Sequence, residues 1–249
     1  MAPAAMLPLA GRVAFVTGSG QGLGAAIARG LAQAGARVAV ADIDQANAQA
    51  VAAEVNGLAL PLDVRDEQAF NDRFAQAVAH FGAVDILVNN AARTPTTSLW
   101  DITPAEWDDV LAINLRGSFF GCRIAGRHMR ARGAGRIVNL ASLAGQQVSS
   151  ATGVHYAASK AGLLALTRAF AQELAPHGVT VNALAPAAID SPALAALAPE
   201  RQQALKAGIP LGRFGLADEV AAAVVYLASP AAAFMTGATL DLNGGRFMR

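Results

Sequence analysis

The hydrophobic positions of this chain fall into two kinds of segment that alternate along the sequence. Short continuous runs of Val, Ala, Leu and Ile end at Gly, Asp or Asn, which is typical of strands buried on both faces of a parallel sheet. The longer segments between them place apolar side chains three and four positions apart, as amphipathic helices do. Strands that alternate with helices across short loops predict a doubly wound α/β fold.

We predict a Rossmann-type, seven-stranded parallel sheet with helices on both faces. The predicted strands are residues 13–17, 36–42, 57–64, 84–92, 135–145, 178–185 and a segment within 237–249. The predicted helices are 25–35, 44–55, 66–81, a long helix from 103, one around residue 156 that ends at 176, and 192–212; residues 213–236 receive no element. No Pro/Gly/Ser-rich linker interrupts the series, so residues 1–249 are predicted to form one domain, with an N-terminal extension (1–10) and a lid (187–212).

Composition and charge argue against several classes of function. Hydrophobic residues make up 54% of the chain, and the formal net charge of +1 argues against nucleic acid or an anionic membrane as the partner. No apolar run approaches the ~18 residues of a membrane span. The opening residues contain prolines and no basic segment, so we expect no signal peptide and a cytoplasmic protein. Cys122 is the only cysteine, so no disulfide or metal site is predicted, and an inert core thiol is favoured over a nucleophile.

A glycine-rich turn follows the first predicted strand and opens the first predicted helix. In T-G-S-G-Q-G-L-G, residues 17–24, Gly18 permits a tight turn, Gly22 lets the backbone approach a pyrophosphate, and Gly24 allows close helix–strand packing. The helix N-terminus would face the phosphates with free N–H groups and a partial positive charge. This context predicts a dinucleotide site; the alternative is a glycine-rich connection without a ligand.

Asp42 ends the second predicted strand, 18 positions beyond Gly24. A carboxylate at this place is expected to bind the hydroxyls of the adenosine ribose and to repel a 2′-phosphate. Since the neighbouring side chains offer no cation for that phosphate, NAD is predicted over NADP; these neighbours are Ser19, Gly20, Gln21 and Ile43. Capping of the next helix is the alternative role for Asp42, but Asp44 suits that role better.

Tyr156 and Lys160 lie four positions apart in a predicted helix and therefore share one face. A phenol, with a pKa of about 10, is a poor acid–base group near neutrality. A nearby ammonium favours the phenolate and lowers the pKa of the phenol. The pair is common by chance, so its meaning depends on the other motifs.

The long helix from residue 103 contains a polar residue in an unfavourable place. Thr103 is predicted to cap it, with Pro104 in the first turn and Glu106 completing a capping box. Asn114 lies in the middle of the helix among apolar neighbours, where an amide is unfavourable. The alternative to a functional role is an exposed helical Asn.

Three motifs together resemble the short-chain dehydrogenase/reductase family: the glycine turn, Asn-Asn-Ala at 89–91, and Tyr156 with Lys160. The resemblance runs from about residue 10 to the C-terminus. It implies that Asn-Asn-Ala lines the cofactor, although Ala92 replaces the family's usual glycine. It also implies that Asn114 kinks its helix and holds a water linked to Lys160, and that Ser142, at the carboxyl end of the fifth strand, binds the substrate oxygen.

The catalytic residues are thus predicted to be Asn114, Ser142, Tyr156 and Lys160. The predicted cofactor-binding residues are Gly18, Ser19, Gln21, Gly22, Leu23, Gly24, Asp42, Ile43, Asp63, Val64, Asn90, Ala91, Ala92, Tyr156, Lys160, Pro186, Ile189 and Ser191. By the same resemblance, Ile189 presents its backbone N–H and C=O to the nicotinamide carboxamide. His155 adjoins Tyr156 and must point elsewhere, so it is not predicted to be catalytic.

The resemblance implies an NAD-dependent secondary-alcohol dehydrogenase or ketone reductase in which Tyr156 is the general acid and base. The apolar lid favours an uncharged small-molecule substrate, such as a 3-oxoacyl group, an aryl or cyclic ketone, or a polyol. The alternatives are a dehydratase or epimerase of related fold, and a catalytically silent NAD-binding sensor or scaffold. A homo-oligomer is expected, with a tetramer favoured and a dimer as the alternative.

Overall fold

The computed structural model of the protein describes residues 7–147 and 151–248, apart from the side chain of Ala193. Residues 1–6 of the predicted extension lie outside the described part. Leu9, within the same extension, is buried, and its N–H donates to Ala34 O at 2.9 Å. The strands are β1 Val13–Thr17, β2 Arg37–Asp42, β3 Leu58–Pro61, β4 Ile86–Asn89, β5 Gly135–Leu140, β6 Val179–Pro186 and β7 Thr239–Leu242. The helices are α1 Gly22–Gln33, α2 Gln45–Glu54, α3 Glu67–Phe81, α4 Pro104–Leu111, α5 Gly117–Arg132, α6 Val154–Leu174, α7 Pro192–Ala195, α8 Pro199–Ala207 and α9 Ala217–Ala228.

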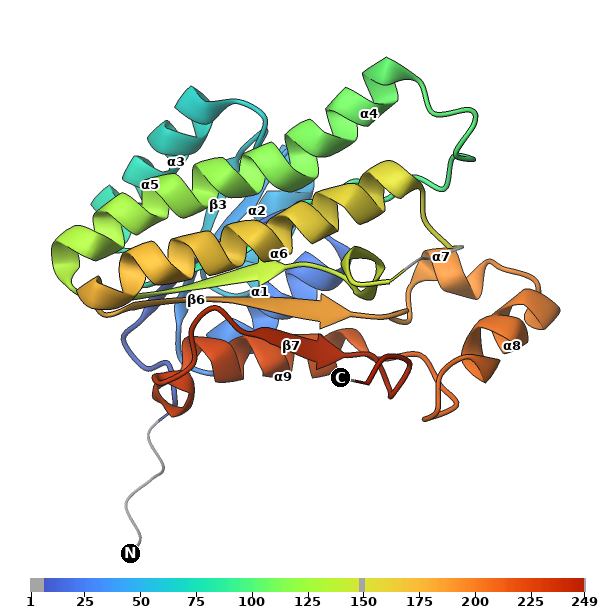
Figure 1. The fold of residues 1–249 in the computed structure, drawn as a ribbon. Helices are drawn as coiled ribbons and strands as arrows, with labels where there is room; N and C mark the ends of the chain where they lie inside the picture. Colours follow the sequence, from blue (N-terminus) through green and yellow to red (C-terminus); the bar gives the residue numbers. More distant parts are fainter. Residues whose placement is uncertain (1–6, 148–150, 249) are drawn as a thin grey trace, which may run out of the picture.

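All seven strands form one parallel sheet in the order β3-β2-β1-β4-β5-β6-β7, and the predicted fold class is confirmed (Figure 1). The chain runs outward from β1 to β3 and then returns to β4, which pairs with β1 through Val16 and Val88. The strand order therefore reverses between β1 and β4. Ligands in such sheets bind outside the carboxyl ends of the strands at this switch point.

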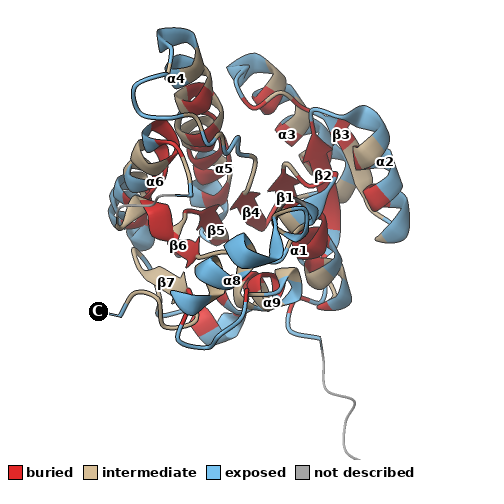
Figure 2. Cartoon of the chain, turned by 90° about the vertical axis from the view of Figure 1, so that its right-hand side faces the viewer, coloured by how far each residue is buried: buried red, intermediate tan, exposed pale blue. Residues whose placement is uncertain are grey.

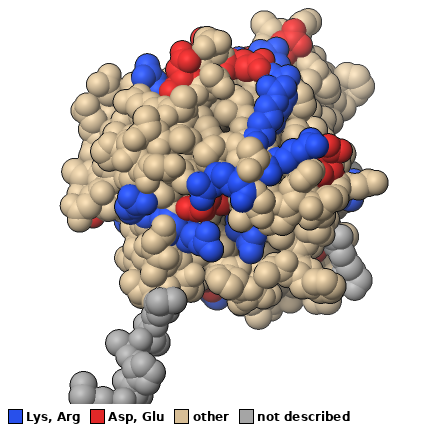
Figure 3. Space-filling view, turned by 90° about the vertical axis from the view of Figure 1, so that its left-hand side faces the viewer, with Lys and Arg blue, Asp and Glu red and all other residues tan. Residues whose placement is uncertain are grey.

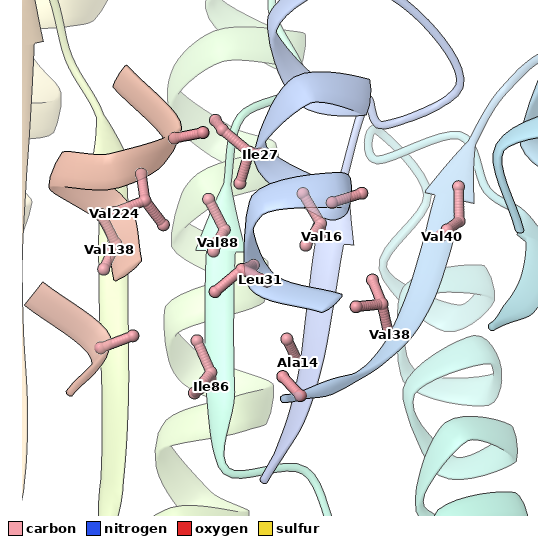
Figure 4. Close-up of a cluster of buried hydrophobic side chains, with 14 of the residues drawn as sticks. Ala14, Val16, Ile27, Leu31, Val38, Val40, Ile86, Val88, Val138 and Val224 are labelled. Carbon is pink, nitrogen blue, oxygen red and sulfur yellow. The ribbon is translucent and has the colours of Figure 1, made fainter. Parts of the chain in front are cut away.

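Helices cover both faces of the sheet, and the strands in its middle, such as β1, β4, β5 and β6, are buried (Figure 2). On one face α1, α2 and α9 pack on Val16, Val40, Val88 and their neighbours (Figure 4). On the other face α3, α5 and α6 pack around Phe15, which stacks on Phe70 at a centroid distance of 5.8 Å. Because both faces are covered, the strands are mostly apolar, which is the pattern that predicted them.

Several predicted strands are too long at their carboxyl ends, because polar side chains end the strands early. Asp63, predicted to end the third strand, lies beyond β3, where its carboxylate accepts a hydrogen bond from Arg65 N at 2.9 Å. Asn90 lies beyond β4, and its amide donates to Gly18 O at 2.8 Å. Ser142 lies beyond β5 and accepts from Ala144 N at 3.1 Å, capping a 3₁₀ turn. These turns bring polar side chains to the edge of the sheet.

The long helix predicted from residue 103 is interrupted. α4 and α5 are joined by a π-helical turn over Ala112–Arg116, which contains Asn114. Thr103 caps α4 as predicted, accepting from Glu106 N at 3.2 Å. The bond from Thr103 N to the Glu106 carboxylate, which would complete the predicted capping box, is not formed. The Glu106 carboxylate accepts a hydrogen bond from Thr97 Oγ1 at 2.7 Å instead.

Helix α9 was not predicted from the sequence. It packs against α1, where a Cβ added to Gly30 would lie 3.0 Å from the Ala221 Cβ. Val220, Val224 and Leu227 are buried at helical spacing, and the Glu219 carboxylate accepts from Leu216 N at 2.8 Å. Both signals are local, so the pattern could have identified this helix.

The predicted lid (187–212) contains two short helices, α7 and α8, in place of one helical segment. Pro199 begins α8, and its missing N–H prevents continuation of the preceding turn. Beyond α8, Leu211 N donates to Gly244 O at 3.1 Å, which ties the end of the lid to the loop after β7. Among the helices of the described residues, none is long and apolar enough to cross a membrane.

Candidate active site

The glycine turn lies at the carboxyl end of β1 and leads into α1. Gly18 has a φ of +62°, and a Cβ there would lie 2.7 Å from the Ala91 Cα, so only glycine fits. A Cβ at Gly24 would overlap the Gly18 carbonyl. Gly22, with a φ of +53°, faces open space, so its backbone is accessible to a ligand. The N-cap residue Gln21 makes no side-chain capping bond, which leaves the first N–H groups of α1 available to an anion.

Asp42 is held rigidly at the end of β2. Its carboxylate accepts hydrogen bonds from Gly20 N at 2.8 Å and Asp44 N at 3.0 Å, and the residue is only 7% exposed. Asp44 caps α2, as expected, by accepting from Asn47 N at 3.0 Å. The carboxylate of Asp42 thus faces the glycine turn.

Arg65 is a cation near this site that the sequence reasoning did not consider. It contacts Asp63 at 2.6 Å and Asp109 at 2.7 Å. These two carboxylates raise the pKa of Arg65, and the guanidinium in turn lowers the pKa of Asp63. Asp109 also contacts Arg93 at 2.6 Å. The charge of Arg65 is therefore already balanced within the chain.

A cavity of about 540 Å³ runs along the carboxyl ends of β1, β2, β3 and β4. Most of the predicted cofactor residues line it, namely Gly18, Gln21, Gly22, Leu23, Gly24, Asp42, Ile43, Asp63, Val64, Asn90, Ala91, Ala92, Tyr156 and Lys160. Arg65 and Thr94 line it too. Its open glycine turn, helix N-terminus and carboxylate fit the pyrophosphate and ribose of a dinucleotide.

Four predicted cofactor residues lie outside this lining: Ser19, Pro186, Ile189 and Ser191. Ser19 is fully buried and donates to Val16 O at 2.7 Å, so its side chain stabilises the turn. Ile189 forms a parallel bridge to Gly215 through Ala188 O and Asp190 N, so its own N–H and C=O point the other way. Ser191 caps α7, accepting from Leu194 N at 3.3 Å, and Pro186 ends β6.

Tyr156 and Lys160 lie on α6, and both are buried. Burial raises the pKa of Tyr156, while hydrogen bonds with Ser142 and Thr94 act in the opposite direction. Lys160 Nζ donates to Leu140 O at 2.6 Å and lies 5.6 Å from the centre of the Tyr156 ring. Burial lowers the pKa of Lys160 to about 8. The surroundings of Tyr156 thus raise its pKa, which is opposite to the lowering that was expected from Lys160.

Asn114, in the π-helical turn, is fully buried and hydrogen-bonded on all sides. Its Oδ1 accepts from Arg93 N at 2.8 Å, and its Nδ2 donates to Arg93 O at 2.9 Å. The same Nδ2 donates to Ser159 Oγ at 3.1 Å. The turn thus fixes the loop after β4 to α6, one residue before Lys160. An exposed helical Asn, the alternative reading, is wrong.

Two further residues bear on the chemistry of the site. Thr94, which was not among the predicted site residues, lines the same cavity as Tyr156, and its hydrogen bond acts to lower the pKa of Tyr156. Cys122 is buried, and burial raises its pKa to about 12, as suits an inert thiol. No group of three or more metal-binding side chains occurs among residues 7–147 and 151–248.

The other end of the sheet, where β4 starts, carries ion pairs and basic side chains. There Arg12 and Arg132 contact Asp85 at 3.5 and 3.1 Å, before the start of β4. Basic side chains gather on this side of the molecule (Figure 3). The predicted catalytic residues lie at the other end, where β5 and β1 finish.

Comparison with known proteins gives consistent matches over almost the whole chain. A family model described as Enoyl-(Acyl carrier protein) reductase matches residues 18–246. The 3-oxoacyl-[acyl-carrier-protein] reductase FabG of Vibrio cholerae is 40% identical, with 96% of this chain and 99% of that protein covered. D-threitol dehydrogenase of Mycolicibacterium smegmatis is also 40% identical, with 95% and 93% covered. A solved short-chain type dehydrogenase/reductase from Mycobacterium marinum has a TM-score of 0.91 at 32% identity, with 98% of each chain covered.

Proposed function

Because the chain belongs to the short-chain dehydrogenase/reductase family of oxidoreductases, we propose that it transfers a hydride between NAD(H) and a secondary alcohol or ketone. The observation that carries this proposal is the position of Tyr156. Its buried phenol is hydrogen-bonded with Ser142, adjoins Lys160, and lines the cavity that the glycine turn opens. A proton-transfer group and a dinucleotide cradle thus share one cavity.

The residues around the cavity support NAD over NADP. The Asp42 carboxylate, held by Gly20 N and Asp44 N, would accept hydrogen bonds from ribose hydroxyls and repel a 2′-phosphate. Arg65 is the nearby cation that could receive a phosphate, but Asp63 and Asp109 already neutralise it. Ile189 would offer its backbone N–H and C=O to the carboxamide, with Pro186 and Ser191 on either side.

The bound nicotinamide would supply the hydride acceptor or donor. In alcohol oxidation the Tyr156 phenolate accepts the substrate hydroxyl proton, and in ketone reduction the phenol returns it. The Ser142 hydroxyl holds the same substrate oxygen and polarises the carbonyl. The Lys160 ammonium favours the phenolate of Tyr156. Asn114, which binds the backbone of Arg93 and the hydroxyl of Ser159, is proposed to belong to the path by which protons move between Lys160 and solvent.

The substrate is proposed to be a 3-oxoacyl group, an aryl or cyclic ketone, or a polyol. The names of two relatives, a 3-oxoacyl reductase and a D-threitol dehydrogenase, fall within this range. Leu194, Leu197 and Leu205 of the lid are partly buried and apolar. They favour an uncharged substrate. The cytoplasmic location stays a prediction.

We also propose that the chain forms a homo-oligomer, with a tetramer favoured. A groove of about 1030 Å³ lies between α4–α5 and α6, lined by Leu111, Leu115, Phe119 and Leu166 among others. Phe234, after α9, is fully exposed and could serve a second contact. Burial of such surfaces against a second copy of this chain would be favourable.

The test is a substrate panel: acetoacetyl-CoA and cyclohexanone with NADH or NADPH, and D-threitol with NAD or NADP, followed by the absorbance of the reduced cofactor. In Tyr156→Phe we expect turnover to fall by about 10²- to 10⁴-fold with unchanged NADH affinity. Tyr226→Phe, at the other tyrosine, which is exposed on α9, is the matched control. Substantial turnover in Tyr156→Phe would remove Tyr156 from its role, and absence of turnover in the wild type on a wider panel would favour a sensor.

A further inference from the structure

His155 is a buried titratable residue that the proposed mechanism does not use. It precedes Tyr156 on α6, is fully buried, and lies outside the cofactor cavity. Its Nε2 lies 3.4 Å from the Glu106 carboxylate, and its ring stacks on Trp107 with an interplanar angle of 17°. A Cβ at Gly153 would clash with the imidazole, so this glycine leaves room for the ring. The residue therefore joins the start of α6 to the first turn of α4.

The Glu106 carboxylate connects His155 to the loop after β4. It accepts a hydrogen bond from Thr97 Oγ1 at 2.7 Å. Thr97 and His155 both lower the pKa of Glu106, with the hydrogen bond from Thr97 the larger cause, so this carboxylate is held ionised. We call Thr97, Glu106 and His155 the clamp.

The loop over residues 93–97 has no regular secondary structure, yet it is attached at three points. Asn114 binds both the N–H and the C=O of Arg93 at 2.8 and 2.9 Å. Pro95 O accepts from Gly153 N at 2.9 Å. The clamp holds Thr97. Thr94 lies between these attachments, and its side chain is the loop group that meets the phenol of Tyr156.

We propose that the clamp is a positioning unit that holds the Thr94 hydroxyl against the Tyr156 phenol, so that Thr94 and Ser142 together orient the proton-transferring group. The proposal rests on the proposed function of Tyr156. Side-chain groups converge on this phenol from three elements: Thr94 from the loop after β4, Ser142 from the turn after β5, and the charged Lys160 from α6 itself. If Thr94 were displaced, the Tyr156 phenol would lose one hydrogen-bond partner and would sample more orientations.

The chain has only two tyrosines, which makes a direct test possible. In protein labelled with ¹³C at the tyrosine ring carbon that bears the hydroxyl, and carrying Tyr226→Phe, a single NMR signal reports Tyr156. The Thr94 hydrogen bond favours the phenolate, so Thr94→Val should move the titration midpoint of this signal upward. Thr97→Val, which has the same shape without the hydroxyl, should move it in the same direction. The double variant should move it no further than Thr94→Val alone, because the clamp acts through Thr94.

The controls separate positioning from general stability. Thr96→Val, in the same loop at an exposed position, should leave the midpoint unchanged, and Thr97→Ser should restore it. Glu106→Gln is a second way to weaken the clamp and should repeat the effect of Thr97→Val. A wild-type midpoint in both Thr97→Val and Glu106→Gln would overturn the proposal. Full additivity of Thr94→Val and Thr97→Val would overturn it as well.

The NMR readout needs neither cofactor nor substrate, so it is independent of the redox assignment. Turnover of the best substrate from the panel should fall on the order of tenfold in Thr97→Val with unchanged NADH affinity. If Tyr156→Phe keeps its turnover, the proposed function fails whatever the NMR signal shows. If Tyr156→Phe is inactive and the clamp variants leave the Tyr156 signal and turnover unchanged, the positioning proposal alone fails.

Discussion

Asp42 shows at the scale of one residue how local geometry prepares a choice between cofactors. Two backbone donors, Gly20 N and Asp44 N, hold its carboxylate at 2.8 and 3.0 Å. The nearby guanidinium of Arg65 is occupied by Asp63 and Asp109. In the proposed complex the carboxylate of Asp42 would therefore meet the ribose, and the one guanidinium in the described cavity lining, that of Arg65, is already paired.

Asp42→Ala is expected to raise the ratio of NADPH to NADH activity by about tenfold or more, since it removes a like-charge repulsion. The kcat/KM values for both cofactors measure this ratio. Asp44→Ala is the control, because it removes a neighbouring carboxylate that caps α2, at a cost of about 1 kcal/mol in stability, and leaves the Asp42 carboxylate in place. Unchanged selectivity in Asp42→Ala would show that the ribose contact is misplaced.

Lys160 links burial to the pH dependence of stability. Burial lowers its pKa to about 8 in the folded protein, whereas an exposed lysine titrates near 10.4. Between these two values the unfolded chain binds more protons than the folded chain. The contribution of Lys160 to the free energy of unfolding therefore rises with pH across this window.

We expect the ligand-free protein to gain on the order of 3 kcal/mol in unfolding free energy relative to Lys160→Met between pH 8 and about 10. Urea unfolding of both proteins at several pH values measures the difference. Above this window the raised pKa of Tyr156 lowers the free energy of unfolding as the pH rises, because the folded protein then binds more protons than the unfolded chain. An equal change in unfolding free energy with pH in the two proteins would contradict the lowered pKa of Lys160.

At the scale of elements, the π-helical turn between α4 and α5 lets a polar side chain serve a buried site. A regular α-helix leaves no unpaired backbone group for an inward-facing amide to bind. Asn114 finds its partners outside the helix, on the backbone of Arg93 and on Ser159. The irregular turn thus connects the loop after β4 to α6.

Asn114→Ala should destabilise the protein by about 1–3 kcal/mol, because it removes the hydrogen bonds of a fully buried amide to Arg93 and Ser159. Asn71→Ala, at an exposed position on α3, should stay within about 0.5 kcal/mol of the wild type. Thermal and urea unfolding provide the comparison. Equal effects of the two substitutions would mean that the bonds of Asn114 contribute little.

At the scale of the whole molecule, the cavity at the carboxyl ends of the strands is separate from the groove between α4–α5 and α6, and the two described linings share only Arg65. The groove has a larger volume than the cofactor cavity, about 1030 against 540 Å³, but its described lining holds none of the predicted catalytic residues. Its lining combines leucines and Phe119 with small residues of α6, such as Gly162 and Ala165. Small residues on a helix allow a second helix to approach closely.

Ala165→Arg is expected to reduce the mass of the assembly, because a charged side chain would occupy the space of the second copy. Size-exclusion chromatography with light scattering measures that mass. Ala50→Arg, at an exposed position on α2 on the other face of the sheet, should leave the mass unchanged. An identical mass for both variants would exclude this groove as the interface.

Local patterns in the sequence determined the alternation of strands and helices, the glycine turn and the pairing of Tyr156 with Lys160. Each depends on residues within one or two turns of chain, where periodicity and steric limits act directly. The unpredicted α9 belongs in the same class, since Val220, Val224 and Leu227 repeat at helical spacing.

Only the tertiary structure decided which distant side chains meet. Thr94 reaches Tyr156 across 62 positions of chain, Arg65 reaches Asp109 across 44, and Glu106 reaches His155 across 49. No short-range pattern encodes these contacts, because they depend on how the loops after β3 and β4 and the helices α4 and α6 pack in space. Periodicity and local chemistry therefore determined the elements and the central pair, and packing decided the polar contacts that surround that pair.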